Sequence, residues 1–183
     1  MKKYELTTNV KTGFGRKLFQ IKALVSFGDV TAGDLGGYIE KEENLSHDGN
    51  AWVYDDARVY GDAWVFGDAR VFGDAMVCGN ARVCGNAWVF GDARVFSNAW
   101  VYDDALVCGD ADYICFKGFG SENRNTTIFR TKNGDVYVCC GCFRGSLKEF
   151  SEKVKETHGS SKYAKEYLAC VEVAKIHFEI EEK

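Results

Sequence analysis

The stretch that decides the fold runs from Asn50 to Asp112 and reads N-AWVYDD-ARVYGD-AWVFGD-ARVFGD-AMVCGN-ARVCGN-AWVFGD-ARVFSN-AWVYDD-ALVCGD-AD. Ten six-residue units follow one another without an insertion. Ala opens every unit, Val follows two residues later, and most units end in Gly followed by Asp or Asn. A fixed short period of this kind is the signature of a repeat architecture.

The unit itself predicts how the chain winds. In an extended Ala-x-Val segment, Ala and Val point to one side and the middle residue to the other, so Ala and Val belong inside. Gly, Asn and Asp tolerate positive φ and suit a corner after each short strand. Three such sides make a coil of about 18 residues, a triangular parallel β-helix that we expect to be left-handed, and a two-sided coil of about 12 residues is the competing geometry.

The segments on either side of the repeat predict two end structures. Residues 1–49 are expected to form a cap, with a hairpin of strands 4–7 and 17–24, followed by irregular first coils in which Leu45 falls in the Ala register and His47 in the Val register. Residues 113–183 are expected to form a small ββαα domain. Its hairpin turns at Asn133-Gly134, its helices span 147–157 and 162–178, and 113–116 is a last strand.

Residues 18 apart should lie on neighbouring coils, about 4.8 Å from one another, so the outward position sorts into three columns. Two columns alternate Trp with Arg, an arrangement that allows cation–π contacts of about 0.5–1 kcal/mol each. Large exposed aromatic surfaces are typical of interaction sites, although ladders that only stabilise the coils would look the same. The predicted partner-binding residues are Trp52, Arg70 and Trp88 with Phe72 and Phe90 in one column, and Trp64, Arg82 and Trp100 in another.

The corners sort into columns in the same way, and one of them is entirely acidic. It contains Asp56, Asp74, Asp92 and Asp110. Solvated turn residues explain such a column, and a cation-binding edge or a row of charge that imitates a phosphate backbone are the functional alternatives.

Composition narrows the classes of function. The net charge of −4 argues against a general polyanion binder, and ten Asp with only four Arg between residues 50 and 112 make the repeat acidic. We recognise no signal peptide and no apolar run long enough for a membrane span, so a cytoplasmic protein that does not bind membranes is expected. The eight cysteines are then expected to be reduced.

Catalytic motifs are not apparent. The repeat resembles that of acyltransferases built on hexapeptide β-helices, which use a His as general base, but the regular coils contain no His, and only His47 in the irregular start could serve. Cys139, Cys140 and Cys142 lack partners at a recognised zinc-site spacing and are interpreted as strand-end thiols. We therefore expect no catalytic residues, no metal and no cofactor. Direct nucleic-acid binding is not favoured, because the helical Lys residues alternate with Glu.

The chain resembles a group of accessory proteins from phages and prophages of Gram-positive gut bacteria. The shared features are Gly-Asp-Leu-Gly-Gly-Tyr-Ile-Glu at 33–40, the tandem repeat units, and a C-terminal segment with Cys140-Gly141-Cys142-Phe143 and Glu156-Thr157-His158-Gly159. This resemblance transfers no catalytic residue. It implies a small protein of a mobile element, of the kind that blocks host defence by binding, including anti-CRISPR inhibitors of Cas nucleases.

Together these observations predict a non-enzymatic protein-binding module of phage origin. Its expected partner is a host defence protein such as a Cas nuclease, bound through the aromatic and acidic surface of the β-helix in the bacterial cytoplasm. A homodimer is also expected, because so many outward aromatic residues favour a covered surface. An acyltransferase-like enzyme and a structural spacer or host-recognition protein are the alternatives.

Overall fold

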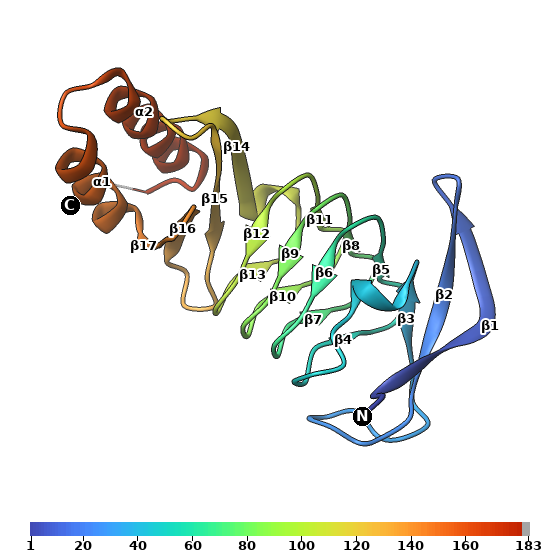
Figure 1. Ribbon diagram of the computed structural model, residues 1–183. Coiled ribbons are helices and arrows are strands. Elements are labelled where there is room, and N and C mark those ends of the chain that lie inside the picture. The colour runs from blue at the N-terminus through green and yellow to red at the C-terminus, as the bar shows by residue number, and fades with distance from the viewer. Residues whose placement is uncertain (181–183) are drawn as a thin grey trace. The chain divides into compact units, whose positions relative to one another are not determined.

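Each hexapeptide folds as a two-residue strand followed by a turn, in the computed structural model that describes residues 1–180 (Figure 1). The Ala and Val side chains of all ten units are buried, at no more than 1% exposure, and form the interior of the coils. The strands are β4 (Trp52–Val53), β5 (Arg58–Val59), β6 (Trp64–Val65), β7 (Arg70–Val71), β8 (Met76–Val77), β9 (Arg82–Val83), β10 (Trp88–Val89), β11 (Arg94–Val95), β12 (Trp100–Val101) and β13 (Leu106–Val107).

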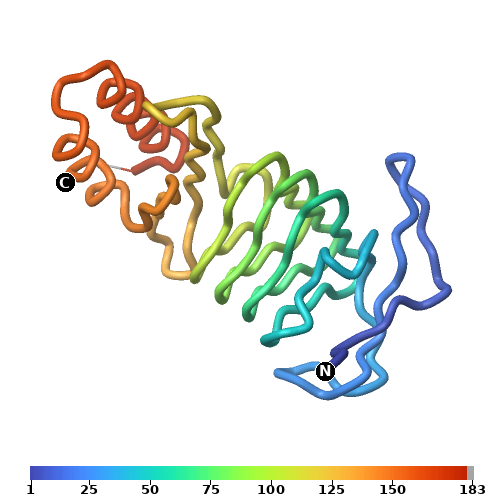
Figure 2. The backbone as a smooth tube through the Cα atoms, viewed as in Figure 1, coloured from blue at the N-terminus to red at the C-terminus, as the bar shows by residue number. Residues whose placement is uncertain are grey.

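Parallel pairing between residues 18 apart stacks these strands into three faces, which confirms the predicted mainly β solenoid with an 18-residue coil. For example, Trp52 lies beside Arg70, and Trp64 beside Arg82. The sheets contain the strand orders β4-β7-β10-β13, β6-β9-β12 and, with the preceding strand β3 (Leu35–Ile39), β3-β5-β8-β11. The smooth backbone trace shows the repeated coils clearly (Figure 2). The sheets contain three or four of these strands, so the solenoid completes about four turns.

The first coil is less regular than predicted, and the expected registers of Leu45 and His47 were wrong. β3 (Leu35–Ile39) pairs with β5, and Leu45 then pairs with Val65, so Leu45 occupies a Val position. The corner between Leu45 and Trp52 is two residues longer than the corner between Val65 and Arg70. His47 lies in this longer corner, which follows η1 (Glu42–Asn44).

An antiparallel hairpin caps the first coil, as predicted. Its strands, β1 (Tyr4–Gly13) and β2 (Arg16–Ala23), extend the sheet that contains β3, because β2 pairs with β3. An irregularity between Leu6 and Val10 interrupts the pairing of β1, which is the outermost strand. Bulges of this kind protect an exposed sheet edge from pairing with another chain.

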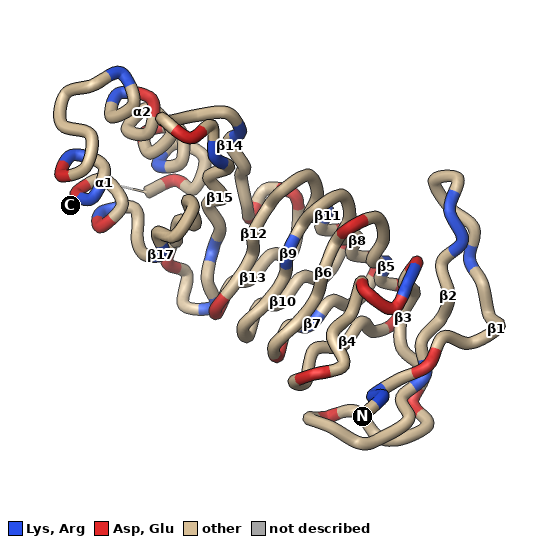
Figure 3. The backbone as a smooth tube through the Cα atoms, viewed as in Figure 1, with Lys and Arg blue, Asp and Glu red and all other residues tan. Residues whose placement is uncertain are grey.

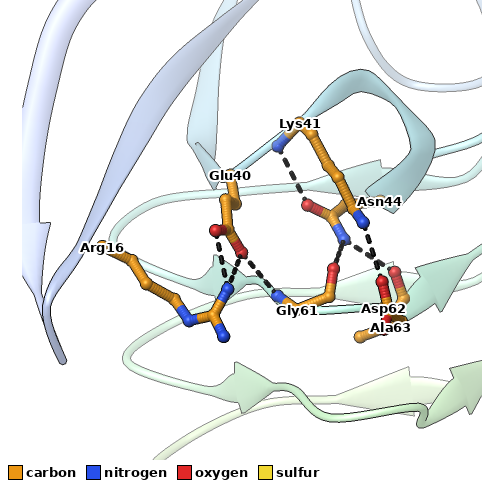
Figure 4. Close-up of polar contacts among 7 residues, drawn as sticks. All are labelled: Arg16, Glu40, Lys41, Asn44, Gly61, Asp62 and Ala63. Atoms are coloured by element: carbon orange, nitrogen blue, oxygen red, sulfur yellow. Dashed lines mark hydrogen bonds and ion pairs between the residues drawn. The ribbon is translucent and has the colours of Figure 1, made fainter.

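Polar side chains fasten the first coil to the second (Figure 4). Glu40 accepts a hydrogen bond from the Gly61 N–H at 2.7 Å, and the Arg16 guanidinium donates to both carboxylate oxygens. The buried Asn44 amide donates to the carbonyl oxygens of Gly61 and Ala63. Because an unpaired buried amide is costly, these bonds fix the position of the first coil.

The protein divides into two units, Met1–Asp110 and Ala111–Lys183. The second unit contains the four-stranded antiparallel sheet β14 (Tyr113–Phe119), β15 (Arg124–Arg130), β16 (Val136–Cys140) and β17 (Phe143–Ser146), followed by α1 (Leu147–His158) and α2 (Lys162–His177). The two predicted helices and the hairpin at Asn133-Gly134 are confirmed. The strand predicted at 113–116 is confirmed as part of β14. The ββαα prediction was incomplete, because β14 pairs antiparallel with β15 and adds a strand to the sheet, and because β17 was not anticipated.

The helices begin where the sequence predicts them. Ser146 accepts a hydrogen bond from the Glu149 N–H, and the Glu149 carboxylate accepts one from the Ser146 N–H. The two helices cover the sheet and bury a core that includes Ile128, Val138 and Phe150. None of the helices within residues 1–180 is long and apolar enough to cross a membrane.

Candidate functional site

The outward side chains of the solenoid form three columns, which we call face one, face two and face three. Strand pairing places them as the 18-residue period predicts. Face one consists of Trp52, Arg70, Trp88 and Leu106, face two of Trp64, Arg82 and Trp100, and face three of Arg58, Met76 and Arg94.

Face one is closed at its N-terminal end, so the prediction that Trp52 contributes to an exposed surface was wrong. Trp52 is only 1% exposed, and its indole packs edge-on against Tyr4 and Phe27. A side chain at Gly36 would collide with the same indole at 2.7 Å. The hairpin and the loop after it therefore use Trp52 as part of their own core.

The middle of face one is also engaged within the protein. Asp29, in the loop after β2, forms an ion pair with Arg70 at 2.9 Å and accepts a hydrogen bond from the Tyr54 hydroxyl. Burial and this hydrogen bond raise the pKa of Tyr54 to about 12, so the hydroxyl remains a donor. Arg70 lies over the Trp88 ring at 5.6 Å. A small hollow of about 200 Å³ remains here, lined by Asp29, Tyr54, Asp55, Arg70, Phe72 and Trp88.

The predicted residues Phe72 and Phe90 belong to a ladder that stabilises the coils. Their rings stack in parallel with centroids 5.0 Å apart, and Phe72 also packs edge-on against Tyr54 and Trp88. All four rings are partly buried. Contacts within the protein thus account for the aromatic residues on and beside face one, and no binding partner is needed to explain them.

The hairpin also contacts residues that flank the first strand of face three. Phe14, at the hairpin tip, stacks on Tyr60 with ring centroids 5.6 Å apart, and Lys11 forms an ion pair with Asp56. Farther along the same side, Phe96 is 54% exposed.

Face two is the more open of the two Trp–Arg columns. Trp64 is 39% exposed and stacks on Phe66 with centroids 4.0 Å apart. Arg82 is exposed and lies over the Trp100 ring at 5.5 Å. The Trp100 indole N–H donates to the Cys84 thiol at 3.3 Å, which fixes the ring. Face two thus presents an exposed indole, an exposed guanidinium and a half-buried indole that are held in place by their contacts, and these residue types are enriched in the centres of protein interfaces.

The acidic corner is not a uniform row of solvated carboxylates. Asp56 pairs with Lys11, and Asp110 accepts a hydrogen bond from the Arg94 N–H at 2.9 Å. Asp74 and Asp92 lie between them and are exposed. The acidic residues of the solenoid lie mainly at the bends of the coils, and the Arg residues on the strands (Figure 3). Within residues 1–180, no group of three or more His, Cys, Asp or Glu is arranged to hold a metal ion.

His47 has a structural role in the cap. The Lys3 backbone N–H donates to its Nδ1 at 3.2 Å, and its ring stacks on Tyr4. Its Nε2 lies 3.7 Å from the Glu42 carboxylate. The neighbouring Lys3 ammonium donates to the carbonyls of Gly49 and Ala51, and burial lowers the pKa of Lys3 to about 8. Both ring nitrogens of His47 thus face groups of the protein itself.

The second unit contains a cavity that sequence reasoning missed. It has a volume of about 530 Å³ and lies between the β14–β15 and β16–β17 turns and the two helices. Its lining comes from several separate elements and turns, so no local motif could have revealed it. The residues are Ser121, Glu122, Arg124, Cys140, Cys142, Phe143, Arg144, Phe150, Lys153, Val154, Thr157, His158 and Tyr167.

Comparison with known proteins identifies the repeat. The family described as YdcK beta solenoid repeat matches residues 51–67 and 69–85. An uncharacterized acetyltransferase, YdcK of Escherichia coli (strain K12), is 45% identical over 42 residues. That alignment covers 23% of this chain and 13% of the length of the relative. The similarity is to a β-solenoid repeat, and it covers a small part of either protein.

Proposed function

We propose that this chain is a non-enzymatic protein-binding module that acts through face two and the acidic bends beside it. The observation that carries the proposal is the Trp64–Arg82–Trp100 column, in which Trp64 and Arg82 are exposed and Trp100 is half-buried. It contrasts with the covered Trp52 and the ion-paired Arg70 of face one. Trp and Arg are the residues most often found at the energetic centres of protein interfaces.

The partner class that we propose is a nucleic-acid-targeting defence nuclease of a bacterial host, such as a Cas nuclease. Charge complementarity supports this class. The solenoid from Asn50 to Asp110 carries nine Asp against four Arg and has no Lys or Glu. Nucleases of this kind guide nucleic acid through positively charged channels, and complementary charge steers association and selects partners.

Cleavage assays with a panel of purified Cas nucleases test the proposal. We expect binding and inhibition of at least one nuclease, with at least a tenfold loss of affinity in the Trp64→Ala variant, because a Trp at an interface centre contributes roughly 2 kcal/mol or more. Met76→Ala, on face three, is the matched control and should bind normally. No binding across the panel, or equal binding by Trp64→Ala, would refute the proposal.

A homodimer would place a second copy of the chain on face two, where it would compete with the nuclease. Sedimentation analysis of the wild-type protein and of Trp64→Ala distinguishes the two occupants. A dimer that dissociates in Trp64→Ala would assign face two to self-association, and a monomer would leave face two available to the nuclease.

Acetyl transfer is the second candidate, because the similar Escherichia coli protein is described as an acetyltransferase. The contacts of His47 argue against its use as the general base, since the Lys3 N–H engages Nδ1 and Glu42 lies beside Nε2. Calorimetric titration with acetyl-CoA tests this candidate directly. Micromolar binding of acetyl-CoA that persists in His47→Gln would favour acetyl transfer through other residues. Absence of acetyl-CoA binding by the wild-type protein would rule out acetyl transfer.

A further inference from the structure

We infer that the cavity of the second unit binds a small organic anion with an apolar body, such as an aromatic or aliphatic carboxylate. The site is independent of face two, and its failure would leave the proposed function untouched. Its volume of about 530 Å³ falls within the usual range for small-molecule sites.

The floor of the cavity is apolar and rigid. Phe150, Val154 and Tyr167 are each no more than 5% exposed, and Phe143 packs against Phe150 with ring centroids 5.1 Å apart. The Phe150 and Tyr167 rings meet edge to face at 5.6 Å. An aromatic or aliphatic group entering the cavity would be surrounded by side chains that are already ordered, so little conformational entropy would be lost on binding.

The rim carries the charge that selects an anion. Arg124, Arg144 and Lys153 line the cavity together with a single carboxylate, Glu122. His158 adds a ring that can donate a hydrogen bond. Lys153 also forms an exposed ion pair with Glu156 at 2.8 Å. Three cationic side chains against Glu122 and Glu156 leave the rim positive, which favours a negatively charged head group over a neutral or positive one.

Two of these cations are positioned by the turn between β16 and β17. The Arg144 guanidinium donates to the Gly141 and Phe143 carbonyl oxygens, each at 2.8 Å. The Arg124 side chain lies directly on Gly141, where a β-carbon would collide with it. Gly141 thus allows an Arg to approach the turn, and the guanidinium groups need little reorganisation to meet a carboxylate.

The carbonyl oxygens at the C-terminal end of α1, which carry partial negative charge, do not cancel the positive charge of the rim. The carbonyl oxygens of Lys155 and His158 accept hydrogen bonds from the Gly159 and Ser161 N–H groups. Burial raises the pKa of Tyr167 to about 12, so this phenol also stays neutral at physiological pH and adds no negative charge to the floor. The cavity remains an apolar pocket with a cationic rim.

Two cysteines provide a direct readout of occupancy. Cys142 is exposed and lines the cavity, whereas Cys108 is exposed on the solenoid. We would measure the alkylation rate of each thiol with iodoacetamide in the presence of 3-phenylpropionate, 3-phenylpropanol or 3-phenylpropylamine. The three probes share a body and differ only in charge.

We expect 3-phenylpropionate to slow alkylation of Cys142 at least threefold, with no change at Cys108, and the neutral and cationic probes to protect less. Lys153→Gln and Arg124→Gln should each weaken protection by the carboxylate roughly two- to fivefold, as expected for partly solvated charges. Lys155→Gln, on α1 like Lys153 but outside the cavity, should leave protection by the carboxylate unchanged. Equal protection by all three probes, absence of protection, or unchanged protection in both charge variants would overturn the inference.

Discussion

Single residues decide how closely neighbouring coils approach. At Gly85 the backbone has φ of 66°, and a β-carbon would lie 2.6 Å from the backbone nitrogen of Asp103 in the next coil. Asp55, Ser97 and Asp103 adopt similar positive φ values of 49° to 64° without being Gly, so the turn itself tolerates a side chain at some cost. The close contact is what makes Gly85 necessary.

Replacing Gly85 by Ala should therefore lower the free energy of unfolding by about 1–3 kcal/mol, from backbone strain and displacement of the next coil. Urea unfolding measures the loss. Gly109→Ala is the matched control, because a β-carbon at Gly109 would meet nothing within 4 Å and the φ of this residue is ordinary. Equal stability of the two variants would contradict the close contact between coils.

Glu40 links stability to pH at the first coil. Partial burial by itself would raise the pKa of Glu40, but the Gly61 N–H and the Arg16 guanidinium lower it overall. A carboxyl group with a lowered pKa stabilises the folded state above its unfolded pKa of about 4.3, and this contribution is lost as the pH falls through the folded value.

Stability should thus fall more steeply between about pH 5 and pH 3 in the wild-type protein than in Glu40→Gln. Urea unfolding at three or four pH values within this range gives the slopes. Glu43→Gln, an exposed neighbour in the same segment, should retain the wild-type slope. A Glu40→Gln slope equal to that of the wild type would show that this carboxylate does not couple folding to pH.

At the scale of elements, the hairpin determines which outward residues are accessible. It buries Ile21 completely, and Ile21 lies against Gly36 and thus beside the covered Trp52. Ile21→Ala should reduce the free energy of unfolding by about 2–4 kcal/mol, because it leaves a cavity in a packed core. Lys22→Ala, exposed on the same strand, is the control. Equal unfolding midpoints would mean that the hairpin contributes little to the first coil.

The same elements show how far the sequence predicts this fold. Ala and Val recur every six residues, so the interior of the coils follows from the pattern alone. The six-residue period favours a three-sided coil over a two-sided one, and the pairing of residues 18 apart decides for three sides. The burial of Trp52 does not follow, because it depends on Tyr4 and Phe27, which have no periodic relation to it. The position of His47 depends on a two-residue insertion in a corner. The sequence of this irregular segment does not show where the insertion falls, so the register of His47 could not be predicted.

The candidate sites were predictable to different degrees. Face two could be anticipated because its members differ by 18 in the sequence. The cavity of the second unit could not, because Arg124, Cys142, Lys153 and Tyr167 meet only when the sheet and both helices have folded. The strand predicted at 113–116 is confirmed within β14, but its antiparallel pairing with β15 was not predicted, because that pairing forms only in the folded sheet.

At the scale of the whole molecule, the two units divide the chemistry between them. Nine Asp against four Arg make the solenoid from Asn50 to Asp110 acidic, whereas residues 111–183 carry twelve Lys or Arg against eleven acids. The solenoid therefore offers a rigid surface of Trp, Arg and Asp, and the second unit offers a cavity with a cationic rim. We propose that the protein meets its partner through face two.

The most direct test is affinity capture from a bacterial lysate that contains a candidate defence nuclease, with quantitative comparison of three forms of the protein. We predict that the wild-type protein and Met76→Ala recover the nuclease equally, and that a Trp64→Ala, Trp100→Ala double variant recovers at least tenfold less, because both anchors of face two are lost. Circular dichroism would verify that the double variant is folded. Equal recovery of the nuclease by the folded double variant would contradict the account.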